Sequence, residues 1–164
     1  MNFGVEIPFV NHLGFELVLF EGGLSQIDYL PKPEHLNSFS VTHGGALMTL
    51  LDVTMAVAAC SVQKDMGVVT TEMKTSFMQP ARGKRTGKGR LMHRTATMAF
   101  TEGTVFNEEG RACAYATDRH LQIRQAAGGG TERRESTAYC HFDRLGFLLD
   151  KSCSSPYFTG SSSS

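Results

Sequence analysis

Short apolar runs separated by polar residues occupy positions 15–30, and the pair Gly22-Gly23 divides them. Apolar residues on both sides of a glycine pair predict two short strands joined by a turn. Pro31 and Pro33 follow and end the strand pairing, because proline has no backbone N–H to donate. We therefore expect a β-hairpin near the start of the chain.

Residues 43–61, HGGALMTLLDVTMAVAACS, carry almost no charge and are rich in Ala, Leu and Met. These residue types favour a helix of about 17 residues. Since the segment is apolar nearly all round, it predicts a core helix covered on most sides by other structure. It is shorter than the roughly 20 residues that a helix needs to span a bilayer, so we expect no membrane segment.

The pattern becomes β-like after residue 66. The run VVTTEMKTSFM is predicted to place alternate side chains on one face, namely Val69, Thr71, Met73, Thr75 and Phe77. A basic turn ARGKRTGKG, the stretch RLMHRTATMAFTEGTVF, a turn NEEG and a last strand RACAYATDRHLQIR follow. The order β-β-α-β-β-β-β predicts an α+β fold, with one long buried helix against an antiparallel meander.

The length of 164 residues suits a single domain, which we expect to span residues 1–125. From residue 126 onward, GGG, the charged TERRES and four final serines show no periodicity, which predicts a poorly ordered, low-complexity tail over 126–164. Because a sheet with one helix on one face leaves its other face and one edge open, the domain is expected to associate with copies of itself.

The charge balance excludes several classes of partner. Sixteen Lys and Arg oppose sixteen Asp and Glu, so no overall field attracts nucleic acid or an anionic membrane. The four cysteines form no CxxC pair, and the opening residues lack a basic region followed by an apolar run. We expect a cytoplasmic protein with no metal site and no cofactor.

The stretch from Asn37 to Asp52, NSFSVTHGGALMTLLD, carries the chemistry. His43, Gly44 and Gly45 lie where a loop enters the predicted helix, and the first N–H groups of a helix have no partner within it. Such N–H groups suit an anion, or the oxyanion that develops on a thioester carbonyl. The glycines leave the main chain open to that carbonyl, and the Asn37 amide is placed to orient substrate or water.

Structural explanations compete with these roles. A glycine pair at a helix start also permits close packing of the helix on a sheet. A lone histidine there, such as His43, is more often a capping or packing residue. The absence of further clustered His, Cys or Glu argues against a metal site.

Asp52 interrupts the apolar run LMTLLDVTMAVAA, where an unpaired carboxylate would cost several kcal/mol. One explanation is a hydrogen bond to a nearby hydroxyl such as that of Thr49 or Thr54. The preferred explanation is a general base or nucleophile that lines a substrate cavity.

These residues together resemble the PaaI-like branch of the hotdog thioesterases, over residues 8–117. In that family an Asn precedes HGG by six residues, an acidic residue follows the first glycine by eight, and a strand of the MKTSFMRP type comes next. Here Asn37, HGG at 43–45, Asp52 and MKTSFMQP at 73–80 match this pattern. The resemblance implies a hotdog fold, in which an antiparallel sheet is wrapped around one long central helix.

The resemblance also implies an acyl-CoA thioesterase that works as a homodimer or a dimer of dimers. The Gly44 N–H would polarise the thioester carbonyl with Asn37 beside it. Asp52 would activate water, or attack as a nucleophile to form a mixed anhydride, and Thr70 would help to hold the water. The residue types leave open which mechanism operates and which acyl group is cleaved.

Helix geometry adds a further expectation. Gly44 and Asp52 are eight residues apart, which is about 12 Å along a helix. One thioester carbonyl cannot reach both, since proton transfer or attack requires about 3 Å. We therefore expect each active site to combine the helix N-terminus of one subunit with Asp52 of its neighbour.

Basic residues are frequent in the predicted turn: Arg82, Lys84, Arg85, Lys88 and Arg90. Arg82, Lys84 and Lys88 are candidates for binding the phosphates of coenzyme A. A solvated hairpin that protects a sheet edge is the competing interpretation.

Two other functions compete with hydrolysis. A non-catalytic hotdog protein that senses acyl-CoA would need the binding site but not the chemistry of Asp52. A hydratase or dehydratase generally needs an acid–base pair on one site, and only Asp52 and the loop residue His43 are visible for it.

The last strand departs from the family pattern, because it reads ATDRHLQIR where relatives usually have ATGTFKY. One coding of DRHLQIR, GAC CGG CAC CTT CAA ATA CGT, reads TGTFKYV when its first base is dropped. We therefore predict a frameshift near Asp118, which would make the tail a translated wrong frame. Real divergence is the alternative, since residues 120–124 still alternate as a strand does.

Overall fold

The computed structural model describes residues 6–124. Two short helical segments accompany one long helix: α1 (Pro8–Leu13), the 3-10 turn η1 (Pro33–His35) and α2 (Gly44–Cys60). The six strands are β1 (Phe15–Glu21), β2 (Leu24–Tyr29), β3 (Met66–Phe77), β4 (Arg85–Arg94), β5 (Met98–Phe106) and β6 (Ala112–Arg124). The predicted order of strands and long helix is confirmed, and α1 and η1 are additions to it.

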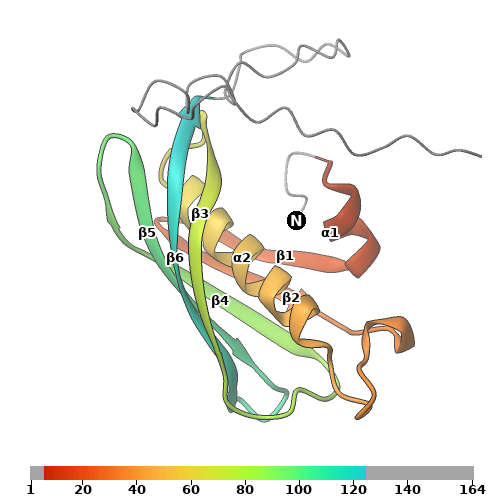
Figure 1. The fold of residues 1–164 in the computed structure, drawn as a ribbon. Coiled ribbons are helices and arrows are strands. Elements are labelled where there is room, and N and C mark those ends of the chain that lie inside the picture. The colour runs from red at the N-terminus through yellow and green to blue at the C-terminus, as the bar shows by residue number, and fades with distance from the viewer. Residues whose placement is uncertain (1–5, 125–164) are drawn as a thin grey trace, which may run out of the picture. The chain divides into compact units, whose positions relative to one another are not determined.

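The strands form one antiparallel sheet in the order β1-β2-β4-β5-β6-β3, and α2 lies across it (Figure 1). The predicted α+β class and the wrapping of the sheet around one helix are confirmed. The predicted meander is only partly right, because β3 pairs with β6 rather than with β4. Helix α2 carries the chain from β2 to the far edge of the sheet, so β3 becomes an edge strand.

Close packing between α2 and the central strands depends on three glycines. A Cβ atom at Gly87 would lie 2.7 Å from Thr54 Oγ1, and one at Gly103 would lie 3.0 Å from Met55 Cγ. At Gly89 it would lie 2.7 Å from a backbone carbonyl oxygen of the helix. Since real side chains do not tolerate such distances, these glycines let the helix lie directly on β4 and β5.

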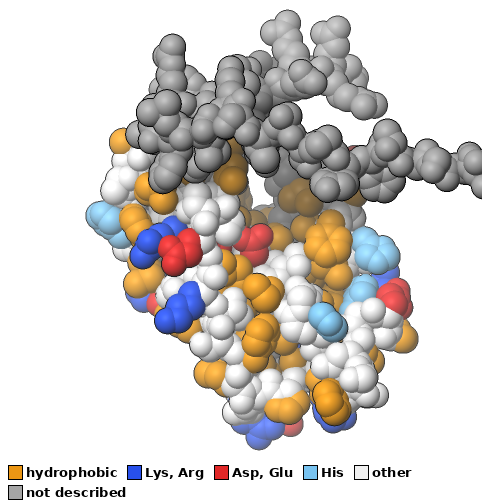
Figure 2. All heavy atoms as spheres, viewed as in Figure 1, with side chains coloured by type: hydrophobic (Ala, Val, Ile, Leu, Met, Phe, Trp, Pro, Cys, Tyr) orange, Lys and Arg blue, Asp and Glu red, His pale blue; other side chains and the backbone are white. Residues whose placement is uncertain are grey.

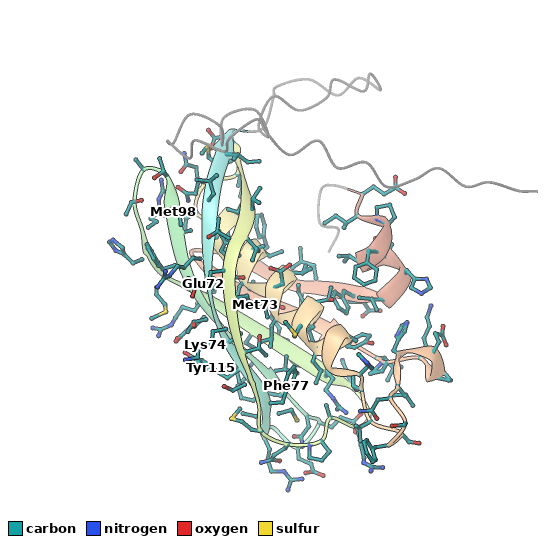
Figure 3. The ribbon with its side chains drawn as sticks, viewed as in Figure 1. Glu72, Met73, Lys74, Phe77, Met98 and Tyr115 are labelled. Carbon is teal, nitrogen blue, oxygen red and sulfur yellow. The ribbon has the colours of Figure 1, made fainter. Side chains whose placement is uncertain are left out.

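The alternation predicted for β3 is interrupted by a bulge. The register with β6 shifts between Thr70 and Glu72, so Thr71 is the extra residue. After the bulge, Met73 and Phe77 point to the helix side of the strand, whereas Glu72 points to the other side (Figure 3). The prediction that Val69 and Thr71 share a face with Met73 is therefore wrong.

The predicted basic turn is shorter than expected. Strand β4 already begins at Arg85, so Lys88 and Arg90 belong to the strand. Arg85 is fully buried, and its Nη1 donates a hydrogen bond to the carbonyl oxygen of Lys84 at 2.6 Å. The sequence pattern misplaced these residues because Gly87 and Gly89 indicate a turn, whereas here they provide room for the helix.

One face of α2 is buried against the sheet, and the opposite face is not covered within the described chain. The buried face carries Leu47, Leu50, Leu51, Thr54, Met55, Ala58 and Ala59. Met48 on the opposite face is 41% exposed, and Asp52 is partly exposed. Hydrophobic side chains gather on this side of the molecule (Figure 2). The prediction of a helix covered nearly all round is therefore wrong for a single chain.

Strand β6 continues in register with β3 to Arg124, so residues 118–124 do form a strand. The predicted low-complexity tail over 126–164 lies outside the described residues.

Candidate active site

The N-terminus of α2 is capped by a histidine side chain. His43 is the N-cap residue, and its Nδ1 accepts a hydrogen bond from the Gly45 N–H at 2.9 Å. A Cβ atom at Gly45 would lie 3.1 Å from that nitrogen, so a larger residue would crowd the cap. The capping interpretation of His43 is therefore confirmed, and the Gly45 N–H is occupied by it. Among the described residues, the Gly44 N–H has no acceptor.

A cavity of about 530 Å³ opens beside this helix start. Its lining comes from the loop before α2, from the first turn of the helix, and from the end of β3 with the loop that follows it: Asn37, Phe39, Val41, Thr42, Gly44, Leu47, Phe77, Met78, Gln79, Pro80, Ala81 and Arg82. A Cβ atom at Gly44 would lie 3.4 Å from the ring of Phe77. Three predicted site residues, Asn37, Gly44 and Arg82, are thus brought to one cavity.

Asn37 organises the loop that borders the cavity. Its Oδ1 accepts hydrogen bonds from the N–H groups of Phe39 at 2.9 Å and Val41 at 3.3 Å. Its backbone N–H donates to the Val41 carbonyl oxygen at 2.9 Å. The side-chain oxygen is therefore committed to the loop, and the Nδ2 amide group is the part of Asn37 that remains for a ligand.

Asp52 lies further along α2 and does not line this cavity. The Thr70 hydroxyl on β3 donates a hydrogen bond to Asp52 Oδ1 at 2.6 Å. Thr49 and Thr54, the two hydroxyls considered from the sequence, instead donate to helix carbonyl oxygens. The structure therefore pairs Asp52 with Thr70, and it separates this pair from Gly44 within one chain.

His120 and Thr101, which were not singled out from the sequence, continue the hydrogen bonding that begins with Asp52 and Thr70. His120 on β6 is fully buried; its Nδ1 is 3.2 Å from Thr70 Oγ1, and its Nε2 is 3.1 Å from the Thr101 Oγ1 on β5. The available sequence signal was a histidine at an alternate position of the last strand. Only the strand register brings it next to Thr70.

Asp118 is a second buried carboxyl group near Asp52. It is 3% exposed, and neither of its carboxyl oxygens has a hydrogen-bond partner among the described residues. Burial and, to a smaller extent, the nearby charge of Asp52 together raise the pKa of Asp118 to about 7. Near neutral pH this carboxyl group therefore holds its proton for a large part of the time.

We expect Asp118→Asn to remove the loss of folding stability that the buried Asp118 carboxyl group causes as pH rises. The folded-state pKa of about 7 exceeds the ordinary value of 3.8, so stability falls as pH rises from about 4 to 7 and is then level. At pH 8 the variant should be more stable than wild type by roughly 2–4 kcal/mol, and near pH 4 the two should be similar. Urea unfolding at fixed protein concentration measures this difference. Equal pH profiles for the two proteins would contradict the buried, protonated state.

The basic residues lie in different surroundings. Arg82 lines the cavity. Lys84 forms an ion pair with Asp28, with an N–O distance of 2.6 Å, and Lys88 Nζ lies 5.6 Å from the ring centre of Phe106. Neither lysine lines the cavity, so the phosphate-binding role predicted for both remains a prediction.

No group of three or more His, Cys, Asp or Glu residues within residues 6–124 could hold a metal ion. In the same residues, no helix is long and apolar enough to cross a membrane.

Comparison with known proteins shows which family part of the chain is similar to. The family model described as the thioesterase superfamily matches residues 39–114, which include Asp52, Thr70 and every residue of the cavity lining except Asn37. The proofreading thioesterase EntH of Klebsiella pneumoniae is 28% identical over 115 residues, or 69% of this chain and 84% of that protein. A Saccharolobus solfataricus protein whose name classes it as an esterase is 29% identical over 105 residues, or 63% of this chain and 75% of that protein.

Solved structures share the fold. The E. coli PaaI protein superposes with a TM-score of 0.66 at 19% identity, and the match covers 70% of this chain and 83% of that protein. A conserved protein of Pseudomonas aeruginosa gives a TM-score of 0.69 at 24% identity, covering 72% and 95%. The chain therefore has the hotdog fold, and its residues 39–114 are similar to the thioesterase superfamily of thioester hydrolases.

Proposed function

We propose that the chain hydrolyses an acyl-CoA thioester to the free acid and coenzyme A, in a homodimer or dimer of dimers whose active sites lie between subunits. Each site combines the α2 N-terminal cavity of one subunit with Asp52 of the neighbour. The observation that carries the proposal is the separation of Gly44, at the cavity, from Asp52, which lies further along the same helix and accepts a hydrogen bond from Thr70 on β3.

The Gly44 N–H acts on the thioester carbonyl oxygen. It has no acceptor among the described residues, it lies in the first turn of α2, and its residue lines the cavity. A fixed N–H at a helix start stabilises an oxyanion as charge develops, because the donor needs no reorganisation. The Nδ2 group of Asn37 borders the same cavity and provides a second donor.

Asp52 acts on water. As a general base, its carboxylate takes one proton from water while the resulting hydroxide adds to the carbonyl carbon. The C–S bond then breaks, and the leaving thiolate of coenzyme A receives a proton. As a nucleophile, Asp52 would instead form a mixed anhydride that water cleaves. In both cases the hydrogen bond from Thr70 holds the carboxylate in place.

The open face of α2 and the free edge of β3 support association of two copies. Within residues 6–124, strand β3 pairs only with β6, and Val69 and Phe77 on it are 48% and 52% exposed. Met48 and Asp52 lie on the uncovered side of α2. If two α2 helices lie antiparallel about a two-fold axis, each N-terminus comes near the Asp52 of the other.

The cavity lining suits an acyl group beside an anionic carrier. Phe39, Leu47, Phe77 and Met78 provide apolar surface, and Arg82 provides a positive charge at the same cavity. Arg82 is thus the strongest of the three predicted phosphate ligands, with Lys84 and Lys88 as further candidates. The balanced charge and the scattered cysteines support a cytoplasmic setting.

We expect Arg82→Ala to raise KM for an acyl-CoA substrate by about three- to tenfold with little change in kcat, because one charged contact to phosphate is lost. Lys84→Ala and Lys88→Ala should have smaller effects in the same direction. Arg119→Ala is the matched control, since Arg119 pairs with Glu72 away from the cavity. Steady-state kinetics at low and high salt measure the effect. An unchanged KM at low salt would show that these basic residues do not bind phosphate and form a solvated hairpin instead.

The proposed activity is tested by incubating the protein with a panel of aryl-acetyl, medium-chain and hydroxylated acyl-CoA thioesters. Release of free thiol is the readout. We expect release from at least one member of the panel, and its identity would name the acyl group. If the protein binds acyl-CoA but releases no thiol from any thioester at micromolar enzyme, the protein is a sensor rather than a hydrolase.

A further inference from the structure

A buried histidine lies directly behind the proposed base. The Cα atoms of His120 and Thr70 are opposite each other in the β3–β6 ladder, so both side chains are on the helix face of the sheet. His120 Nδ1 contacts the Thr70 hydroxyl at 3.2 Å, and Nε2 contacts the Thr101 hydroxyl at 3.1 Å. Both ring nitrogens of this fully buried residue therefore have a partner.

The direction of these hydrogen bonds follows from the carboxylate at the end of the series. An ionised Asp52 can only accept, so Thr70 uses its single proton in the 2.6 Å bond to Oδ1. His120 Nδ1 must then donate to Thr70 Oγ1, and in a neutral ring Nε2 must accept from Thr101. Burial lowers the pKa of His120, which favours the neutral ring.

We propose that His120 is a positioning residue for Asp52, and that it acts through the Thr70 hydroxyl to fix the orientation of the carboxylate. The inference rests on the proposed function, because it gives His120 a task in a reaction for which Asp52 is the base or nucleophile. All three hydrogen bonds run in one direction, from Thr101 through His120 and Thr70 to Asp52. Aligned donors of this kind polarise and strengthen one another.

Asp118 also lies near His120, but Thr101 is the residue that forms the hydrogen bond with Nε2. Its Oδ2 is 3.7 Å from His120 Nε2, which is beyond hydrogen-bonding distance. With Asp118 protonated for much of the time near neutral pH, it does not require a charged imidazole beside it. The first donor in this series of hydrogen bonds is therefore the hydroxyl of Thr101, a residue that is 1% exposed.

A kinetic experiment separates positioning from packing. We expect His120→Leu to lower kcat by about 10- to 100-fold with KM changed less than about twofold, as for residues that orient a catalytic group. His120→Asn, whose amide nitrogen can replace the Nδ1 donor, should restore most of the kcat. In a Thr70→Val background His120→Leu should have little further effect, because its route to Asp52 is already lost. His93→Leu removes an exposed histidine that stacks on Phe100, and it should leave kcat unchanged.

Nitrogen NMR of the full-length protein provides a second readout that does not need turnover. We expect the His120 signals, assigned by their loss in His120→Leu, to show a protonated Nδ1 and an unprotonated Nε2. The opposite tautomer, a charged ring, or fully additive effects of the Thr70 and His120 variants on kcat would overturn the role of His120 while wild-type activity stands. Absence of activity in the wild-type protein would instead remove the proposed function, and this role with it.

Discussion

Replacing Asp52 with Asn is expected to lower kcat by a factor on the order of 10²–10⁴ while the protein remains folded. Asn has nearly the same size, and its Oδ1 can still accept the hydrogen bond that Thr70 donates to Asp52. The substitution therefore removes the proton acceptor, or the nucleophile, and little else. KM should change little, because the substitution leaves the residues that line the cavity unchanged.

The measurement is steady-state thiol release with the best substrate of the panel, together with circular dichroism and the oligomeric state of the variant. Asp65→Asn is the matched control, because Asp65 is an exposed carboxylate in the loop between α2 and β3. It should retain wild-type turnover. A folded Asp52→Asn protein with near-normal kcat would remove Asp52 from the mechanism.

Much of the fold could be predicted because its elements have strong local signals. The glycine pair between β1 and β2 and the long, almost uncharged run of α2 both predicted their elements correctly. The place of β3 in the sheet could not be predicted, since strand order depends on packing between residues far apart in the chain. The bulge at Thr71 is likewise set by pairing with β6 and has no local signal.

The candidate site was predictable where residue types combine with fixed spacing. Asn37 and Gly44 do border one cavity, and Asp52 does bond to Thr70. His120 could not be found in the same way, because its relation to Asp52 passes through the register of β3 with β6 and through the hydroxyl of Thr70. The different surroundings of Arg82 and Lys88 also depend on where β4 begins.

The reading frame after Thr117 stays a prediction. Strand β6 buries Asp118, His120 and Gln122, and the oxygens of Asp118 and Oε1 of Gln122 have no partner among the described residues. Unpartnered polar atoms at buried positions are costly, and a wrong frame would produce them by chance. His120, in contrast, has both nitrogens bonded. Sequencing the source DNA decides the matter, and a confirmed uninterrupted frame with no family-like overlap would contradict a frameshift.

The shared active site predicts recovery of activity when two inactive variants are combined. Asn37→Ala damages the cavity side of a site, and Asp52→Asn removes its carboxylate. In a mixed dimer, one site contains both lesions and the other contains neither. With random pairing about half of the dimers are mixed and half of their sites are intact, so roughly a quarter of wild-type activity should return.

Co-refolding of the two variants, followed by thiol release, is the measurement that tests the shared site most directly. Each parent is first shown to be a folded, inactive dimer, and each is also refolded alone as a control. Exchange of subunits is verified with two different affinity tags. The account predicts roughly a quarter of wild-type activity in the mixture and none in either parent. If verified mixed dimers are as inactive as the parents, the two halves of the site belong to one subunit and the account is wrong.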